Sequence, residues 1–232
     1  IEVNSVLRQY EKMQQVIHSG NLERNYVRFG FSTLVGDLSA PLICRKFLDS
    51  YPELHIHLTQ CSGLELLRKL EHQQLDVVLT GKKYSERPDW FGKFEGFPMR
   101  ESTLSFCVSK SDSRSLMKSI TMEEIAKQPV ILPDETFPAS MRVESLFASG
   151  GHPLNIILRS SQIYTVLRFI STGIAGGFLP SASCLEAPSI VPIPCEELAE
   201  ELRLRSMLFW NRDAHISPIL NAFIQCARAI TT

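Results

Sequence analysis

The chain lacks a large excess of charge of either sign. Its 232 residues contain 24 Lys and Arg against 25 Asp and Glu, which gives a formal net charge of −1. Because binding to nucleic-acid phosphates needs a concentrated positive field, the chain is not predicted to bind DNA or RNA by itself. Long apolar runs are also missing, and no stretch approaches the length of a membrane span. The hydrophobic fraction of 44% is ordinary for a chain that buries a core.

Closely spaced cysteines are absent as well. The six cysteines are widely separated, and several stand in apolar runs, such as Cys107 in LSFCV and Cys226 in AFIQCARAI. Reduced, buried cysteine behaves as a small hydrophobe, so the pattern argues against a zinc or disulfide framework and favours a reducing compartment. The N-terminal stretch IEVNSVLRQYEKMQQ is polar and amphipathic, unlike a secretory signal, and it does not begin with Met. We therefore expect a fragment or processed product of a cytoplasmic protein.

Catalytic motifs are missing too. The patterns GxSxG, HExxH and GxxxxGK[ST] do not occur, and the glycines of Gly173–Phe178 precede a strand, whereas a dinucleotide loop follows one. His55 and His57 share one face of a predicted strand and could bind a metal only with a third ligand, so a surface position is favoured. The sequence predicts no enzyme, no metal site and no cofactor.

What the sequence does contain is a repeated alternation of strand and helix patterns. Strands are predicted at residues 27–31, 54–59, 75–79, 104–109, 129–133, 155–159, 176–180, 190–194 and 204–210. Helices are predicted at about 38–50, 63–74, 121–127, 138–149, 162–172 and 216–230. Such alternation indicates an α/β fold with a mostly parallel sheet that is covered on both faces.

The alternation is interrupted near residue 100. The segment 81–102 is rich in loop-forming residues, and a second α/β series follows it. We therefore expect two lobes, between which the chain crosses near 100–104 and returns near 203–207, so that two strands form a hinge. Residues 1–19 carry an apolar stripe that could pack either on their own domain or against a second helix in a dimer.

Small polar residues gather where strands give way to helices. In open α/β sheets, ligands bind outside the carboxyl ends of the strands, near the unpaired N–H groups of helix N-termini. The four such turns contain Ser32-Thr33, Cys61-Ser62, PDETFPAS with Thr136 and Ser140, and Ser160-Ser161-Gln162. Serine and threonine are also ordinary N-caps, and Ser62 with Glu65 fits a capping box. Capping alone is favoured for Ser62, whereas capping and ligand binding both stay open for Ser32-Thr33.

Cys61 lies in the second of these turns, beside a predicted helix N-terminus. That position makes Cys61 the strongest candidate for a reactive thiol, since helix N-termini favour the thiolate. An ordinary small side chain at a turn remains the favoured interpretation.

The order of these parts resembles a known family. A linker-like helix is followed by VRFGFSTLVGDLSAPLICRKFLDSYPELHIHL, then LLRKLEHQQLDVVLT, FPMRESTLSFCVSKSDS, ITMEEIAKQPVILP and VLRFISTGIAGGFLPSAS. This series is similar to the effector-binding domain of LysR-type transcriptional regulators over roughly residues 25–230. The resemblance implies two Rossmann-like lobes joined by a two-stranded hinge, as in type 2 periplasmic binding proteins, with a small-molecule effector between them.

The resemblance also implies a domain organisation. Residues 1–24 would end a linker helix, residues 25–102 with 206–232 would form lobe I, and residues 103–205 would form lobe II. The family's N-terminal winged helix-turn-helix, which binds promoter DNA, is absent from this chain. Members usually form homodimers through these domains and homotetramers on DNA. The alternative is a transport-associated solute-binding protein of the same fold.

Effector contacts are carried over from the family by position. They are Ser32, Thr33, Cys61, Ser62, Pro133, Thr136, Phe137, Ser161, Gln162 and Ile163. Among them, Thr33 and Ser161 are expected to approach one shared space from opposite lobes. The chain departs from the family pattern at Cys61, at the acidic pair Asp134-Glu135, and at an additional glycine in GIAGGFLP, which we expect to be locally flexible.

Overall fold

The computed structural model describes residues 24–32, 39–82, 86–135 and 137–231. Its strands are β1 Tyr26–Phe31, β2 His55–Gln60, β3 Val77–Gly81, β4 Phe94–Ser109, β5 Pro129–Pro133, β6 Asn155–Ser160, β7 Gly176–Pro180, β8 Ile190–Ile193 and β9 Arg203–Asn211. Its α-helices are α3 Ser39–Ser50, α4 Gly63–Glu71, α6 Met122–Ala126, α7 Pro138–Ser149, α8 Ile163–Ser171 and α9 Pro218–Arg228. Short 3₁₀ segments are η1 Pro88–Trp90, η2 Ser113–Leu116, η3 Ser181–Glu186 and η4 Glu196–Leu198. The predicted linker helix at residues 1–19 lies outside the described residues.

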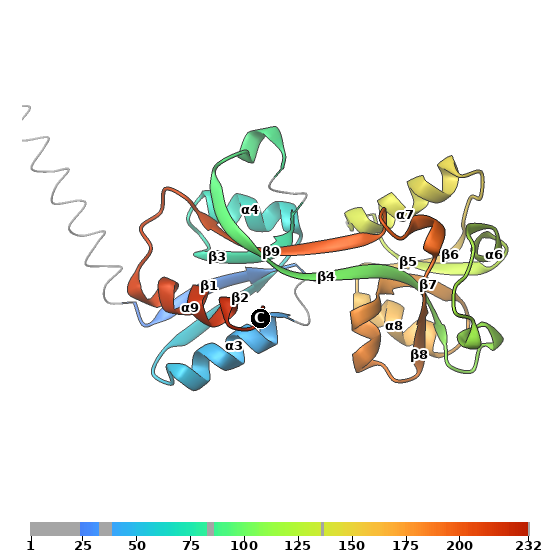
Figure 1. Ribbon diagram of the computed structural model, residues 1–232, viewed down its shortest axis with the longest axis horizontal. Helices are drawn as coiled ribbons and strands as arrows, with labels where there is room; N and C mark the ends of the chain where they lie inside the picture. Colours follow the sequence, from blue (N-terminus) through green and yellow to red (C-terminus); the bar gives the residue numbers. More distant parts are fainter. Residues whose placement is uncertain (1–23, 33–38, 83–85, 136, 232) are drawn as a thin grey trace, which may run out of the picture.

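Two lobes stand side by side, and the long strands β4 and β9 connect them (Figure 1). Lobe I contains β1, β2, β3, α3, α4 and α9, and lobe II contains β5, β6, β7, β8, α6, α7 and α8. The strand order β2-β1-β3-β9-β4-β7-β5-β6 runs through both lobes, and β8 pairs with β4. The fold class predicted from the sequence, two α/β lobes with a two-stranded hinge, is confirmed. The lobe boundaries predicted at 102/103 and 205/206 stay a prediction.

Each lobe has the same inner arrangement. In lobe I, β1 pairs in parallel with β2 and β3, and in lobe II, β5 pairs in parallel with β6 and β7. Antiparallel partners complete each set: β9 joins β3, and β4 joins β7. The sheet is therefore mixed, because the two strands that cross between the lobes cannot continue a parallel βαβ repeat.

Apolar side chains cover both faces of each sheet. On one face of lobe I, Phe29 packs with Phe47 of α3 and Phe223 of α9, and on the other face Val78 packs with leucines of α4. Lobe II places Phe106 and Phe147 on one face and Ile131 with α8 residues on the other. Burying both faces explains why these strands read as continuous apolar runs.

Helix ends follow the local sequence signals. Thr121 and Glu124 form the complete predicted capping box at the start of α6. At α4 only half of the motif is present, since the Ser62 hydroxyl accepts the N–H of Glu65 at 3.3 Å. Gly173 follows α8 with a φ of +79°, the left-handed conformation expected of a glycine that ends a helix.

One segment differs from its prediction. The sequence places loop throughout 81–102, but β4 already begins at Phe94 and pairs with β9 from Phe94 onward. Charged residues and Pro98 hide the strand pattern, although Phe97 and Met99 are buried. Among the described residues, β4 pairs on its other side only from Leu104 onward, so this part is an edge, and an edge position tolerates a proline.

The glycine pair of β7 also differs from its prediction. A Cβ on Gly176 would lie 2.2 Å from the Phe106 ring, and one on Gly177 would lie 2.3 Å from the Ile131 carbonyl oxygen. Both glycines are buried inside a strand. The expectation of local flexibility is therefore wrong, because the glycines allow neighbouring atoms to approach closely.

Candidate functional site

The strand directions bring the carboxyl ends of the two parallel sets toward each other. Strand β4 runs from lobe I into lobe II, and β9 runs antiparallel to it. Because β3 is antiparallel to β9, the strands β1, β2 and β3 point toward lobe II. Because β7 is antiparallel to β4, the strands β5, β6 and β7 point toward lobe I. We call the region between these ends the facing edges; it is where α/β folds hold ligands.

The lobe I turns contribute residues of different exposure. Ser32 is buried at the end of β1, and its N–H donates to the Leu79 carbonyl oxygen at 3.0 Å. Ser62 is exposed and caps α4. Cys61 is half-buried after β2 and packs beside the α4 cluster. Thr33 lies outside the described residues.

The electrostatic environment of Cys61 does not favour a reactive thiol. Burial, followed by the nearby Glu65 carboxylate, raises the pKa of the Cys61 thiol despite the opposing charge of Lys69. A raised pKa reduces the thiolate fraction, and the thiolate is the nucleophile. Cys61 therefore lacks the environment that its position in the sequence suggested.

In the lobe II turns, neither helix is capped by the side chain of its own N-cap residue. Phe137 is the N-cap of α7 and Gln162 is the N-cap of α8, and neither side chain accepts a hydrogen bond from its helix. Pro133 is buried at the end of β5, Ser161 and Gln162 are exposed, and Ile163 is buried in the α8 core. Thr136 lies outside the described residues. Both helices present a positive dipole end toward the turns, and α8 also presents backbone N–H groups, whereas α7 begins with Pro138 and its Ser140 N–H donates to the Phe137 carbonyl oxygen.

Three hydroxyl groups near the facing edges are buried without a partner among the described residues. They belong to Thr80 in β3, Ser102 in β4 and Ser140 in the first turn of α7. Leaving such a group unsatisfied costs about 1–3 kcal/mol, so each of these hydroxyls is a candidate hydrogen-bonding group for a bound molecule. Ser140 stands in a turn that the sequence identified, whereas Thr80 and Ser102 were missed. Thr80 directly follows Leu79, whose carbonyl oxygen accepts the Ser32 N–H.

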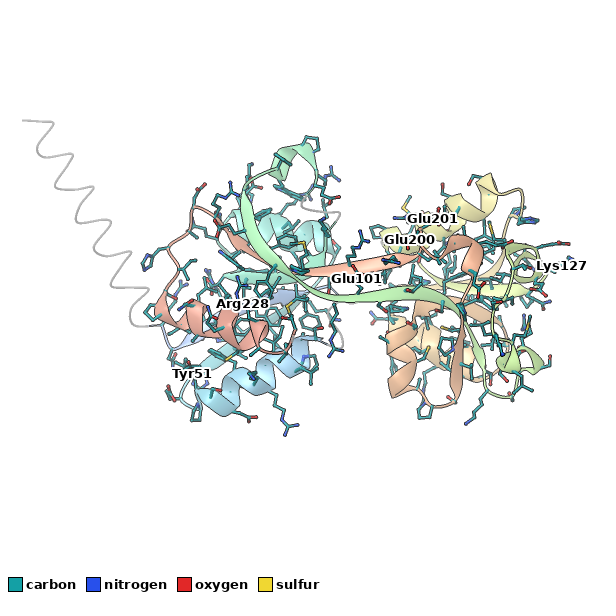
Figure 2. All side chains as sticks on the ribbon, in the orientation of Figure 1. Tyr51, Glu101, Lys127, Glu200, Glu201 and Arg228 are labelled. Atoms are coloured by element: carbon teal, nitrogen blue, oxygen red, sulfur yellow. The ribbon has the colours of Figure 1, made fainter. Side chains whose placement is uncertain are left out.

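The strands between the lobes carry a group of ion pairs. Glu101 of β4 pairs with Arg205 of β9 at 2.9 Å and with Arg203 at 3.5 Å, and Arg203 also pairs with Glu200. Figure 2 shows Glu101 on the connecting strands and Glu200 closer to lobe II. These partly exposed contacts join the two strands at the register shift that follows Pro98.

Two histidines considered as metal ligands have a different setting. The His57 ring stacks on Tyr26 with ring centroids 4.1 Å apart. Across the described part of the chain, no group of three or more His, Cys, Asp or Glu is placed to hold a metal ion. None of the helices in the described ranges has both the length and the apolarity needed to cross a membrane.

Comparison with known proteins gives this arrangement a family. The family described as the LysR substrate binding domain matches residues 20–231. The chain belongs to this family. Its members are regulator domains, which confirms the resemblance seen in the sequence and agrees with the prediction that this LysR domain is not an enzyme.

Relatives and solved structures agree with the assignment. YybE, an uncharacterized HTH-type transcriptional regulator of Bacillus subtilis, is 23% identical over 224 residues, covering 96% of this chain and 74% of YybE. The regulator Cbl of Escherichia coli is 22% identical over 145 residues, covering 62% of this chain but only 45% of Cbl. The effector binding domain of QuiR, solved in complex with shikimate, is 18% identical with a TM-score of 0.73, covering 90% of this chain and 98% of that domain. YybE and Cbl are transcriptional regulators, so they favour a regulator domain over a solute-binding protein for this LysR domain.

Proposed function

We propose that this domain senses a small polar molecule that binds at the facing edges. Lobe I would contribute Ser32, Thr33, Cys61 and Ser62, and lobe II would contribute Pro133, Thr136, Phe137, Ser161, Gln162 and Ile163. To these we add the hydroxyls of Thr80, Ser102 and Ser140. The observation that carries the proposal is that these three buried hydroxyls lack a partner among the described residues.

The chemistry of the region favours a ligand that accepts hydrogen bonds. The N-terminus of α8, where the Gln162 side chain makes no cap bond, offers N–H groups, and the dipoles of α7 and α8 each add roughly 0.3–1 kcal/mol of attraction for negative charge. Hydroxyl groups can serve both hydroxylated and anionic ligands. QuiR, which shares the fold, binds shikimate, which supports a small organic ligand of this kind.

Binding would act by selecting one arrangement of the lobes. Only β4 and β9 run from one lobe to the other, among the described strands, so these strands form the hinge on which the lobes turn. A ligand that contacts both lobes binds a closed arrangement more tightly and shifts the population by that difference in affinity. In a full-length cytoplasmic regulator, the change would reach promoter DNA through an N-terminal helix-turn-helix.

Self-association would use the two ends of the sheet. Strands β2 and β6 lie at opposite ends of the strand order, and each exposes a large apolar side chain: Leu58 is 57% exposed and Ile157 is 50% exposed. A two-fold axis can place the β2 end of one copy on the β6 end of the other and bury both. We therefore propose a homodimer built by these ends, from which a homotetramer could assemble on DNA.

Thermal-shift screening followed by calorimetry tests the ligand site. A panel of small carboxylic acids, polyols and phosphorylated metabolites should contain compounds that stabilise the domain. Thr80→Val and Ser140→Ala should each weaken the affinity for a hit about fivefold, since each removes one hydrogen bond of about 1 kcal/mol. Thr172→Val is the control, because its hydroxyl bonds to the Phe169 carbonyl oxygen at the far end of α8. Wild-type affinity in Thr80→Val and Ser140→Ala would contradict the site.

Sedimentation tests the dimer. The wild-type chain has a mass of 26.2 kDa, and at micromolar concentration it should sediment as a dimer with twice that mass. Leu58→Asp should shift the domain toward monomer, since it would bury a charge in the contact. Leu116→Asp is the control, because Leu116 is 91% exposed in η2, which is not part of either sheet end. A wild-type monomer, or a dimer that Leu58→Asp leaves intact, would contradict the proposed contact.

A further inference from the structure

Two cysteine sulfurs lie close together in the core of lobe II. The Sγ atoms of Cys107 in β4 and Cys184 in η3 are 3.4 Å apart, close enough for an S–H···S hydrogen bond. Both cysteines belong to the apolar cluster between the sheet and α8. Cys107 is fully buried, whereas Cys184 retains 7% exposure. Their sequence separation of 77 residues gave no hint of this pairing.

The backbone holds the two residues from neighbouring elements. Cys107 lies opposite Gly177 of β7 and Pro192 of β8, and η3 is the segment that connects those two strands. Cys184 therefore lies on a short connection packed over the strand that carries Cys107. A disulfide needs the sulfurs about 2.05 Å apart, so they must approach by more than an ångström. A side-chain rotation with a small shift of a 3₁₀ segment can supply that movement.

We propose that Cys107 and Cys184 form a reversible disulfide when the domain meets a peroxide. The Cys184 sulfur attacks one peroxide oxygen, the O–O bond breaks, and the products are a Cys184 sulfenic acid and water. The Cys107 sulfur then attacks the Cys184 sulfur, its proton leaves with the sulfenic hydroxyl as a second water, and the S–S bond forms. The two thiols are oxidised by two electrons and the peroxide is reduced by two.

The environment of each sulfur assigns these roles. The hydrogen bond from Cys107 lowers the pKa of the Cys184 thiol, and the same hydrogen bond together with burial raises the pKa of Cys107. Cys184 is the one cysteine of the six whose pKa is lowered, since burial raises the pKa of Cys44, Cys61, Cys195 and Cys226. The less buried sulfur thus carries more thiolate and reacts first, and the fully buried sulfur resolves the sulfenic acid.

The cross-link would restrain one side of the facing edges. Segment η3 begins directly after Pro180, the carboxyl end of β7. A disulfide would fasten this segment to β4, the strand that continues into lobe I. Disulfide formation itself does not depend on the proposed ligand, so the two proposals can fail separately.

Peptide mapping of the folded wild-type domain tests the proposal. The domain is exposed to hydrogen peroxide, denatured with an alkylating agent and digested without reductant. The expected result is a peptide pair joined through Cys107 and Cys184, lighter by two hydrogen atoms, with two of the six thiols lost and restored by dithiothreitol. Wild-type protein that keeps all its thiols, or that accumulates Cys184 sulfinic acid without the link, would overturn the proposal.

Matched variants identify the partners. Cys184→Ser and Cys107→Ser should each abolish the joined peptides, and Cys184→Ser should also slow the loss of Cys107 thiol. Cys195→Ser removes another buried cysteine of lobe II and should leave the cross-link unchanged. A cross-link that persists in Cys107→Ser through a different cysteine would overturn the assignment.

Discussion

Lobe I and lobe II repeat one plan with different detail. In each lobe a central strand, β1 or β5, lies between two parallel neighbours. A helix follows the first and the second strand of each set of three parallel strands. In lobe I the N-cap side chain of α4 accepts a hydrogen bond from its helix, whereas the N-cap side chains of α7 and α8 in lobe II make no such bond. Lobe II also packs strands around two adjacent glycines, while the β1 strand of lobe I has one. The two lobes therefore share their strand and helix order but differ in helix capping and in the glycines of their strands.

The largest difference is expected at these glycines. In Gly177→Ala the new Cβ would meet a backbone atom, the Ile131 carbonyl oxygen, at 2.3 Å. In Gly30→Ala it would meet the ends of the Leu66 and Leu75 side chains at 2.6 Å, which can rotate away. We expect Gly177→Ala to lower the free energy of unfolding by about 3 kcal/mol or more and Gly30→Ala by about 1 kcal/mol. Urea unfolding of both variants measures the difference.

A third glycine provides the control for that comparison. Gly151 has a φ of +77° with nothing within 4 Å of an added Cβ, so Gly151→Ala reports backbone strain without a steric clash. Its cost should be close to 1 kcal/mol. If Gly177→Ala costs no more than Gly151→Ala, the close approach of β5 and β7 does not constrain lobe II as described.

The next difference concerns two Arg–Asp pairs. In lobe I, Asp76 accepts hydrogen bonds from the Arg28 backbone N–H and guanidinium, and so joins residues 48 apart in sequence. In lobe II, Asp112 pairs with Arg114 within a single turn. Asp76→Ala should cost about 2 kcal/mol, because it removes charged hydrogen bonds between β1 and the residue that precedes β3. Asp112→Asn should cost about 1 kcal/mol, since its contacts are local.

The lobe II pair should also show a dependence on pH. Hydrogen bonding from Arg114, outweighing burial, lowers the pKa of the Asp112 carboxyl from its ordinary value of 3.8. The pair therefore stabilises the fold fully above that value, and the stabilisation is lost as pH falls through the lower native pKa. Urea unfolding below about pH 4 should show a shallower fall in stability for Asp112→Asn than for wild type. Parallel curves for the two proteins would contradict the assignment.

The comparison also shows where the sequence was informative. Strands β5 and β7 were predicted with their observed bounds, because each is a short apolar run bordered by proline or glycine. The start of β4 was missed, since an edge strand can carry charged residues and Pro98 without losing its pairing. Local signals therefore located these buried strands better than the first half of β4.

The candidate site was predictable only in part. Position after a strand identified the turns, because parallel strands end at a common edge. The missing partners of Thr80 and Ser102, and the closeness of Cys107 to Cys184, arise from packing between segments distant in sequence. No local pattern distinguishes a buried hydroxyl with a partner from one without.

The smallest effects are expected at the helix caps. The Ser62 hydroxyl accepts the Glu65 N–H, so Ser62→Ala should lower the free energy of unfolding by about 1 kcal/mol. The Gln162 side chain makes no such bond, so Gln162→Ala should change the free energy of unfolding by no more than a few tenths of a kcal/mol. Urea unfolding of the two variants compares the helix that starts after β2 with the one that starts after β6.

Gln162→Asp sharpens this last comparison. An aspartate there can cap α8, which should raise stability by about 0.5–1 kcal/mol, while its charge competes with an anion for the same N–H groups. A compound found by thermal-shift screening that carries a carboxylate should therefore bind Gln162→Asp more weakly than Gln162→Ala. If the Gln162→Asp domain is more stable but binds the carboxylate compound as well as Gln162→Ala does, the N-terminus of α8 does not take part in ligand binding. In that case the missing cap of α8 would be a property of lobe II packing alone.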